Sequence, residues 1–339
     1  MIQLSVVKHA VRLACRAPSL HNTQPWRWVA RRDGLHLYLD RIRVMGATDA
    51  AGREALISCG AVLHHLRVAV AAAGWDGVVT RFPDGEHADH LAAVRFRPTD
   101  VVEPCRRRLA DAILVRRTDR LPFAAPPDWD TVHARLLGLL DALGLPGVHL
   151  DVIAEADHPR LVAAAALADA SRLDDTRYQL ELHWWTTDFV FTEGIPRSAL
   201  VTAAEGRRVA VGRTFPAAAG RERRGELPDD RAVITVLSTA DDGPAAALHC
   251  GEALSAVLLE ATAAGLSTCT LSHLTEVPES RAEVADLIGG DSRPQVLVRI
   301  GRAPALEGAP APTPRRPLDD VLDIDPEPTG VARPSGEHW

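Results

Sequence analysis

Residues 17–26 gather side chains that could recognise a small polar ring. The string Ala-Pro-Ser-Leu-His-Asn-Thr-Gln-Pro-Trp holds hydroxyl, imidazole and amide groups beside two prolines, as in a loop between a helix and a strand. The amides of Asn22 and Gln24 each carry a donor beside an acceptor, which matches a pyrimidine-like ring edge. On these properties alone, a helix-ending turn in which Ser19 and Asn22 satisfy backbone groups is the commoner interpretation.

Two arginine clusters could bind phosphate. The first is Arg116-Arg117-Thr118-Asp119-Arg120, and a helical backbone there would bring Arg116 and Arg117 onto the face of Arg120. Converging guanidinium groups match phosphate oxygens with planar sets of donors, although a solvated arginine run is more common. The second cluster, Arg315-Arg316, lies in a proline-rich segment that gives it little reason to be packed.

Other chemistry-bearing segments are weaker candidates. His64-His65 and the histidine-containing segment 86–90 could each ligate a metal, but neither brings three convergent ligands, so we predict no metal site. No G-x-G-x-x-G or G-x-x-x-x-G-K-[ST] string occurs, which leaves a dinucleotide-binding unit or a P-loop unsupported. The aromatic side chains of segment 183–189 could stack over a ring, but they are more often part of a core.

Composition limits the class of protein. The 339 residues carry 38 basic and 45 acidic side chains, a net charge of −7, and 46% are hydrophobic. This suffices for the core of one large or two modest domains, and it argues against nucleic-acid binding, which needs a concentrated basic face. The five cysteines form no C-x-x-C pair, as expected of free thiols in a reducing compartment. Because no long apolar run occurs, we expect a cytoplasmic protein without a membrane segment.

Periodic patterns predict the elements that position these residues. Residues 3–16 have a helical pattern that ends before the first proline. Residues 26–40 alternate apolar and polar positions on both sides of Asp33-Gly34, which predicts a β-hairpin. Residues 53–74 place apolar side chains at spacings of three and four and stop at a glycine, which predicts a buried helix.

A second helical pattern, at residues 247–265, repeats this buried helix at an offset of 191 positions. The offset pairs Cys59-Gly60 with Cys250-Gly251 and repeats the Ala-Ala-Gly ending. An alanine-rich chain could produce such identities by chance, but each helix also follows an extended segment and precedes an apolar strand, at 91–97 and 295–301. We therefore predict two related α+β halves in tandem.

An insertion and a tail distinguish the second half. Between a helical stretch at 155–183 and a strand at 232–238, the chain carries an extra segment at residues 184–230. Long insertions in compact domains are usually lids, binding loops or disordered excursions. The proline-rich tail, residues 303–339, predicts an extended arm over the surface and not another packed element.

Together these segments resemble the FMN-dependent nitroreductases. APSLHNTQPW looks like their P-S-x-x-N-x-Q-P-W stretch, and RRTDRLPF is similar to the R-R-S-x-R-x-F segment that grips the flavin phosphate. GLSTCTL, VLVRIGRAP and PRRPLDDVL resemble their closing segments, so the matches span most of the chain. The resemblance implies a three-layer α+β nitroreductase-like fold with FMN as cofactor.

The order of these motifs departs from that of an ordinary member, in which the arginine motif precedes P-S-x-x-N. Ordinary members are homodimers with two flavins at the interface, each touched by both subunits. The reversed order implies such a dimer fused into an intramolecular pseudo-dimer, with halves at 1–108 and 109–339 and one surviving flavin site. Since its pairing surface is already occupied, the chain should be a monomer or a weak homodimer.

The resemblance assigns roles to ten positions. The FMN phosphate would be held by Arg116, Arg117 and Arg120, helped by Arg315 or Arg316. The ring would face Ser19 and Asn22, with Gln24, and its reactive N5 edge would face the backbone of Ser267 and Thr268. Because the flavin carries the redox chemistry, no catalytic side chain is expected.

Two functions remain open for such a protein. The chain is most like the Acg group of nitroreductase-like flavoproteins, in which a lid covers the flavin and storage or sequestration of flavin has been proposed. The 184–230 insertion is the candidate lid, which favours sequestration. In the alternative, an active reductase, NADH or NADPH docks against the flavin and a nitroaromatic compound or a quinone then takes its place.

Overall fold

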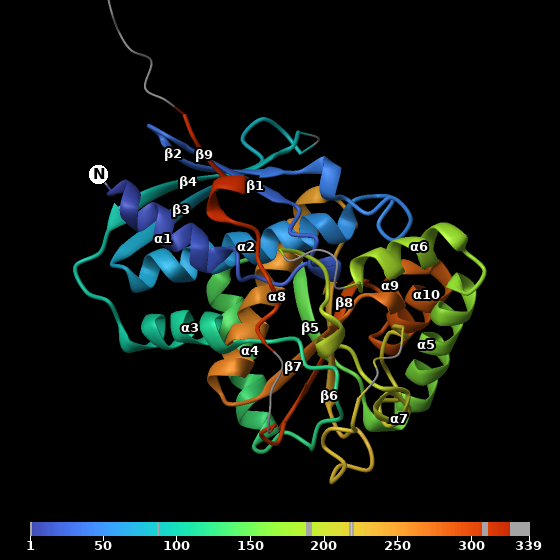
Figure 1. Ribbon diagram of the computed structural model, residues 1–339. Helices are drawn as coiled ribbons and strands as arrows, with labels where there is room; N and C mark the ends of the chain where they lie inside the picture. Colours follow the sequence, from blue (N-terminus) through green and yellow to red (C-terminus); the bar gives the residue numbers. More distant parts are fainter. Residues whose placement is uncertain are drawn as a thin grey trace, which may run out of the picture.

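The computed structural model describes residues 2–86, 88–187, 192–216, 218, 220–306 and 311–325. Its elements follow the chain in two successive groups (Figure 1). The first group consists of α1 (Leu4–Ala14), β1 (Trp26–Arg31), β2 (Gly34–Leu39), α2 (Arg53–Ala72), β3 (Trp75–Arg81), β4 (His90–Pro98) and α3 (Pro104–Val115). The second consists of α4 (Trp129–Leu143), β5 (Val148–Val152), α5 (His158–Arg172), α6 (Thr176–Trp185), α7 (Ala203–Arg207), β6 (Val233–Thr239), α8 (Pro244–Ala263), β7 (Ser267–Leu271), α9 (His273–Glu276), α10 (Pro278–Leu287), β8 (Arg293–Gly301) and β9 (Leu322–Ile324).

The hairpin and the buried helix of the first group are confirmed. β1 and β2 pair antiparallel from Trp26 opposite Leu39 to the turn. Trp26 and Trp28 are fully buried while Arg27 between them is exposed, as alternation along a strand requires. α2 covers most of the predicted helix. Its apolar length would suffice to cross a membrane, but most of that stretch is buried inside the protein.

Apart from β9, which joins the first sheet from the second group, the two groups form two sheets with the same strand order. One sheet runs β3-β4-β2-β1-β9 and the other β7-β8-β6-β5. In each, two strands precede a long helix and two follow it, and the matching pairs are antiparallel. A register irregularity recurs at equivalent places, between Leu37 and Tyr38 on β2 and between Leu237 and Ser238 on β6. The order of elements is therefore duplicated.

The long helices α2 and α8 form the layer between the sheets. α2 shares a core with the first sheet, and α8 shares one with the second. The helices cross where Gly60 meets Gly251. A Cβ atom at Gly60 would lie 2.0 Å from the carbonyl oxygen of Leu248, and one at Gly251 would lie 2.0 Å from that of Ile57. The 191-residue offset relates both pairs, so the contact is reciprocal, as in a two-fold interface.

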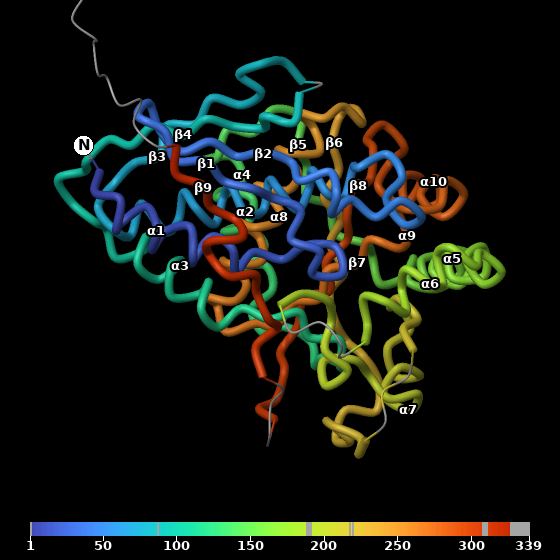
Figure 2. Tube along the Cα trace, turned by 45° about the horizontal axis from the view of Figure 1, so that its top comes forward, coloured from blue at the N-terminus to red at the C-terminus, as the bar shows by residue number. Residues whose placement is uncertain are grey.

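The structure corrects three expectations. The helical stretch 155–183 is two helices, α5 and α6, interrupted at 173–175. The arginine string is not helical, because α3 ends at Val115 and the backbone of Arg116 leaves the helical region (φ −57°, ψ 132°). The described part of the C-terminal arm does not stay on the surface: β9 pairs in parallel with β1, and Val321 is buried in the first core (Figure 2). The apolar side chains of Val321 and Leu322 are buried there, and β9 adds a strand to the sheet.

Candidate functional site

A cavity of 590 Å³ lies where the two groups of elements meet. This volume is typical of sites that hold a small molecule or cofactor. Segments far apart in the sequence line it: the 18–22 loop, the start of α2, the 116–120 string, residues 269–273 at the end of β7, the 195–215 part of the insertion, and Arg315 of the C-terminal arm. Six of the ten expected ligand residues are on its walls, namely Ser19, Asn22, Arg116, Arg117, Arg120 and Arg315.

Several arginines on these walls, among them Arg16, Arg116 and Arg315, contact no carboxylate within the described part of the chain. Arg16, Arg116 and Arg315 donate hydrogen bonds to backbone carbonyl groups, including those of residues 15–17. Among the described residues the Nε of Arg116 has no hydrogen-bond partner, although Arg116 is only 7% exposed. Burial, and then neighbouring guanidinium groups, lower the pKa of Arg116 to about 10 and that of Arg315 to about 9. A bound anion would relieve this uncompensated charge.

The arginine string reaches the cavity as a strand-like segment. Thr118 pairs in parallel with Thr268 of β7, which fixes the path of the backbone beside the second sheet. Arg120 places its guanidinium 5.1 Å from the centre of the Phe215 ring, within the range of a cation–π contact. Pairing with β7, and not helical spacing, therefore brings the arginines of the string to one wall.

The loop after α1 forms another wall. His21, Asn22 and Gln24 have positive φ angles of 44°, 61° and 52°, a conformation that costs energy for residues other than glycine. The Ser19 hydroxyl accepts the backbone N–H of Gln24, and the Asn22 amide donates to the carbonyls of Gly194 in the insertion and Pro314 in the C-terminal arm. These contacts hold the strained loop in place. They also use both N–H donors of the Asn22 amide before any ligand binds.

Four of the expected ligand residues lie outside the described lining of this cavity. The Gln24 side chain is fully buried, where it donates to the carbonyl of Thr192 and accepts the backbone N–H of Arg316. The Arg316 guanidinium turns to backbone carbonyl groups, including that of Gln24. Ser267 lines a second cavity of 290 Å³, and Thr268 is buried beside the arginine string. From β7, the larger cavity is lined by residues 269–271.

The cavity also has polar residues that the sequence analysis missed. Both ring nitrogens of His21 and of His273 lack hydrogen-bond partners in the part of the chain that the structure describes. Burial lowers the pKa of both histidines well below the ordinary value, so both rings are neutral near pH 7. Glu54 of α2 has an unpartnered carboxyl oxygen. His21 lies inside the 17–26 loop motif. His273 and Glu54 lie in the first turns of α9 and α2, where no local sequence pattern predicts a role in a site.

The insertion is held against α6 and α9 by a buried arginine. Residues 195–215 border the cavity, and Arg213 pairs with Glu276 of α9. The same guanidinium donates to the Ser272 hydroxyl at 2.9 Å and to the Tyr178 hydroxyl at 2.6 Å. Asp169 of α5 accepts the hydroxyl of Thr214 at 2.5 Å. This wall is therefore tied to α5, α6 and α9.

The remaining candidates lie away from the cavity. His64 and His65 each contact the Ser255 hydroxyl at 2.7 Å, between α2 and α8. Within the described residues, no three His, Cys, Asp or Glu side chains gather in a metal-binding arrangement. Trp184 is 59% exposed, and Phe189 lies outside the described residues.

A family model matches most of the second group of elements, and known proteins match nearly the whole chain. Residues 160–302 match the family model described as Nitroreductase family. The chain is 54% identical over 324 residues to the Mycobacterium tuberculosis protein named "Putative NAD(P)H nitroreductase acg", with 96% of this chain and 97% of that protein covered. The chain belongs to the nitroreductase family. A second relative of the nitroreductase-family chain, "Uncharacterized protein Rv3127" of the same organism, is 50% identical over 323 residues, covering 94% of this chain and 93% of that protein.

A solved structure is also similar to this nitroreductase-family chain. The FMN-dependent nitroreductase NfnB from Mycobacterium smegmatis, in complex with NADPH, is 18% identical with a TM-score of 0.41, covering 65% of this chain and 99% of that chain. The family model begins at residue 160, so the 17–26 loop and the arginine string lie outside the part of the chain that it matches.

Proposed function

We propose that this nitroreductase-family protein binds one FMN in the larger cavity, with the phosphate at the arginines and the ring beside Ser19 and Asn22. The observation that carries the proposal is the meeting, on one cavity, of the 18–22 loop with arginines that contact no carboxylate in the described chain. A phosphate monoester with a charge of about −1.5 to −2 near pH 7 would compensate them. The flavin would supply the redox chemistry, and the protein its placement.

The proposed site belongs to an intramolecular pseudo-dimer. The matching strand orders and the reciprocal contact of Gly60 with Gly251 support this interpretation. α3 contains the expected junction at 108/109 and packs against both α2 and α8, as a linker between halves would. Because α2 and α8 already pack against each other within one chain, no such helix face is left for a second copy. We therefore expect a monomer or a weak homodimer, and sedimentation can measure which state occurs.

Flavin sequestration is the activity that the insertion favours. Its 195–215 part walls the cavity, and Arg213 ties that part to Glu276. A hydride donor must come within about 3–3.5 Å of the acceptor atom, so a wall that stays closed would prevent turnover. The alternative, an active NAD(P)H-dependent reductase, is favoured by the name of the relative that is 54% identical. Anaerobic mixing of the FMN-loaded protein with NADH and with NADPH separates the two. Slow or absent bleaching supports sequestration, and rapid bleaching supports the reductase.

Loss of two arginines tests the site itself. A hydrogen bond to a charged group contributes about 1.5–3 kcal/mol, so the double variant Arg116→Ala with Arg120→Ala should lose about 3–6 kcal/mol of binding free energy. This corresponds to roughly a 100- to 10,000-fold weaker FMN affinity by flavin fluorescence titration. Arg106→Ala is the matched control, because Arg106 pairs with the exposed Asp76 outside the described lining of the cavity. Wild-type affinity in the double variant would contradict the assignment.

A further inference from the structure

We propose that Glu54 is a neutral carboxyl group at the cavity wall, that it donates a hydrogen bond to the bound flavin ring, and that loss of its proton weakens flavin binding. The inference rests on the proposed flavin site and adds a residue to it. Glu54 borders the cavity and is only 4% exposed. A carboxylic acid has one O–H donor that the carboxylate lacks, so its proton decides what it can bind.

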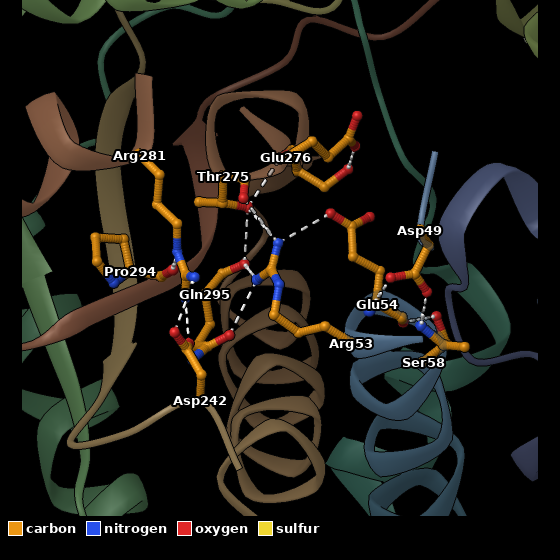
Figure 3. A network of polar contacts seen from close by, with 12 residues as sticks. Asp49, Arg53, Glu54, Ser58, Asp242, Thr275, Glu276, Arg281, Pro294 and Gln295 are labelled. Carbon is orange, nitrogen blue, oxygen red and sulfur yellow. Dashed lines mark hydrogen bonds and ion pairs between the residues drawn. The ribbon is translucent and has the colours of Figure 1, made fainter. Parts of the chain in front are cut away.

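The contacts of Glu54 favour the neutral form. Within the described chain its Oε2 is buried without a hydrogen-bond partner, and its Oε1 has one contact, at 3.3 Å, with Arg53. Figure 3 shows Arg53 reaching from the first turn of α2 toward Thr275 and Gln295, where it makes four hydrogen bonds of 2.8–3.1 Å. The shorter contacts of Arg53 therefore go elsewhere. A buried carboxylate oxygen without a donor is costly, and protonation lowers that cost because a neutral group loses less hydration than a charged one.

The charges around Glu54 lead to the same conclusion. From its own helix and the preceding loop it faces Arg53 and Asp49, from α9 it faces Glu276, and from the insertion it faces Arg213. Asp49 accepts the backbone N–H groups of Glu54 and Ala55, and Glu276 pairs with Arg213. Three carboxyl groups thus share two arginines. Burial, and then the Glu276 charge, raise the pKa of Glu54 to about 8, although Arg53 opposes the shift.

Glu54 also lies beside the loop that is expected to face the ring. The Ser58 hydroxyl, one turn along α2, donates to the Glu54 carbonyl and accepts the backbone N–H of Leu20. At the offset of 191, the counterpart of Glu54 in α8 is Ala245. The duplicated helix therefore forms without a carboxyl group at this position. A role toward the cavity explains the difference between the two helices.

Glu54 is the cavity group best placed to titrate between about pH 7 and pH 9. His21 and His273 stay neutral there, because burial lowers the pKa of each well below its ordinary value. Burial also raises the pKa of Asp169, but Asp169 already accepts a hydroxyl hydrogen bond from Thr214 in the insertion. Arg315, with a pKa of about 9, begins to lose its proton in the same range, but it is expected to hold the phosphate, so its effect should be absent with riboflavin. A change in affinity that riboflavin shares with FMN therefore points to Glu54.

The test is the pH dependence of flavin affinity, measured by fluorescence titration with FMN and with riboflavin. Riboflavin has no phosphate, so a pH effect common to both ligands belongs to the ring. For one proton, riboflavin affinity should fall roughly tenfold between about pH 7 and about pH 9 in the wild type. In E54Q, whose amide keeps a donor, riboflavin affinity should stay constant. E260Q is the control and should keep the wild-type slope, because Glu260 is a buried carboxyl on α8 that pairs with Arg108 and Arg135 outside the described lining.

The outcomes separate this inference from the proposed function. A wild-type protein that binds FMN with no pH dependence, or an E54Q variant that keeps the slope, overturns the role of Glu54 and leaves the flavin site standing. A wild-type protein that binds neither flavin overturns both. If E54Q does not fold, infrared spectra of the wild type without and with flavin decide the question. Without flavin, a buried carboxylic-acid band must disappear between about pH 7 and about pH 9, and with flavin it must persist to higher pH, because binding favours the protonated form. Absence of the band near pH 7 in the flavin-free protein refutes the inference.

Discussion

The crossing of α2 and α8 gives the sharpest prediction for stability. Gly60→Ala would place a Cβ 2.0 Å from the carbonyl oxygen of Leu248 and 2.8 Å from the Cα of Gly251. Both contacts are with backbone atoms, so the helices must move apart by about 1 Å. Overpacking of a core costs about 1–3 kcal/mol and sometimes more, and a rigid backbone contact belongs at the upper end. Alanine is more favourable than glycine inside a helix by about 1 kcal/mol, so the net loss in the free energy of unfolding should be about 2 kcal/mol or more.

Urea unfolding followed by far-UV circular dichroism measures this loss. Gly138→Ala is the control, because Gly138 lies inside α4 and a Cβ there has no neighbour within 4 Å. That variant should gain up to about 1 kcal/mol from helix propensity alone. Gly251→Ala should cost about as much as Gly60→Ala, since its Cβ would meet the Ile57 carbonyl at the same 2.0 Å.

The double variant tests whether one contact carries both effects. Once α2 and α8 have separated for one methyl group, the second needs little further movement, so the combined loss should be smaller than the sum. A Gly60→Ala protein as stable as the wild type would refute the reasoning. So would a large cost at Gly60 with none at Gly251, because that result is incompatible with a reciprocal contact.

Two further predictions concern reactivity and acid stability. Cys105 is exposed and the other four cysteines are buried, and burial raises the pKa of Cys15 and Cys250 to about 12. A disulfide reagent should therefore modify the native protein chiefly at Cys105, and Cys105→Ser should abolish the rapid phase. Burial alone would raise the pKa of Glu205, but hydrogen bonds from Arg223 and from the Thr202 backbone lower it to about 2. The stability that Glu205 contributes is present above its unfolded pKa of about 4.3 and lost as pH falls toward 2, so the advantage of the wild type over E205Q in urea unfolding should shrink across that range. An advantage that stays constant would contradict this.

Sequence alone determined the elements whose signals are local. The hairpin around Asp33-Gly34 followed from alternation, and the two long helices from the spacing of their apolar residues. The repeated Cys-Gly pair marked the place where those helices meet, because only glycine permits so close a crossing. The family resemblance named the segments that would form a site.

Tertiary structure decided the parts of the site that depend on distant partners. Arg116 and Arg120 share a wall because their segment pairs with β7, a partner about 150 residues away in sequence that no local pattern encodes. Arg16 joins them from the end of α1, and β9 reaches the first sheet from the far end of the chain. The sequence shows Glu54 as an ordinary acidic residue in the first turn of a helix. Folding buries Glu54 beside the carboxyl group of Glu276, and one oxygen of Glu54 has no hydrogen-bond donor among the described residues. The protonation of Glu54 depends on this environment, which the residue type does not specify.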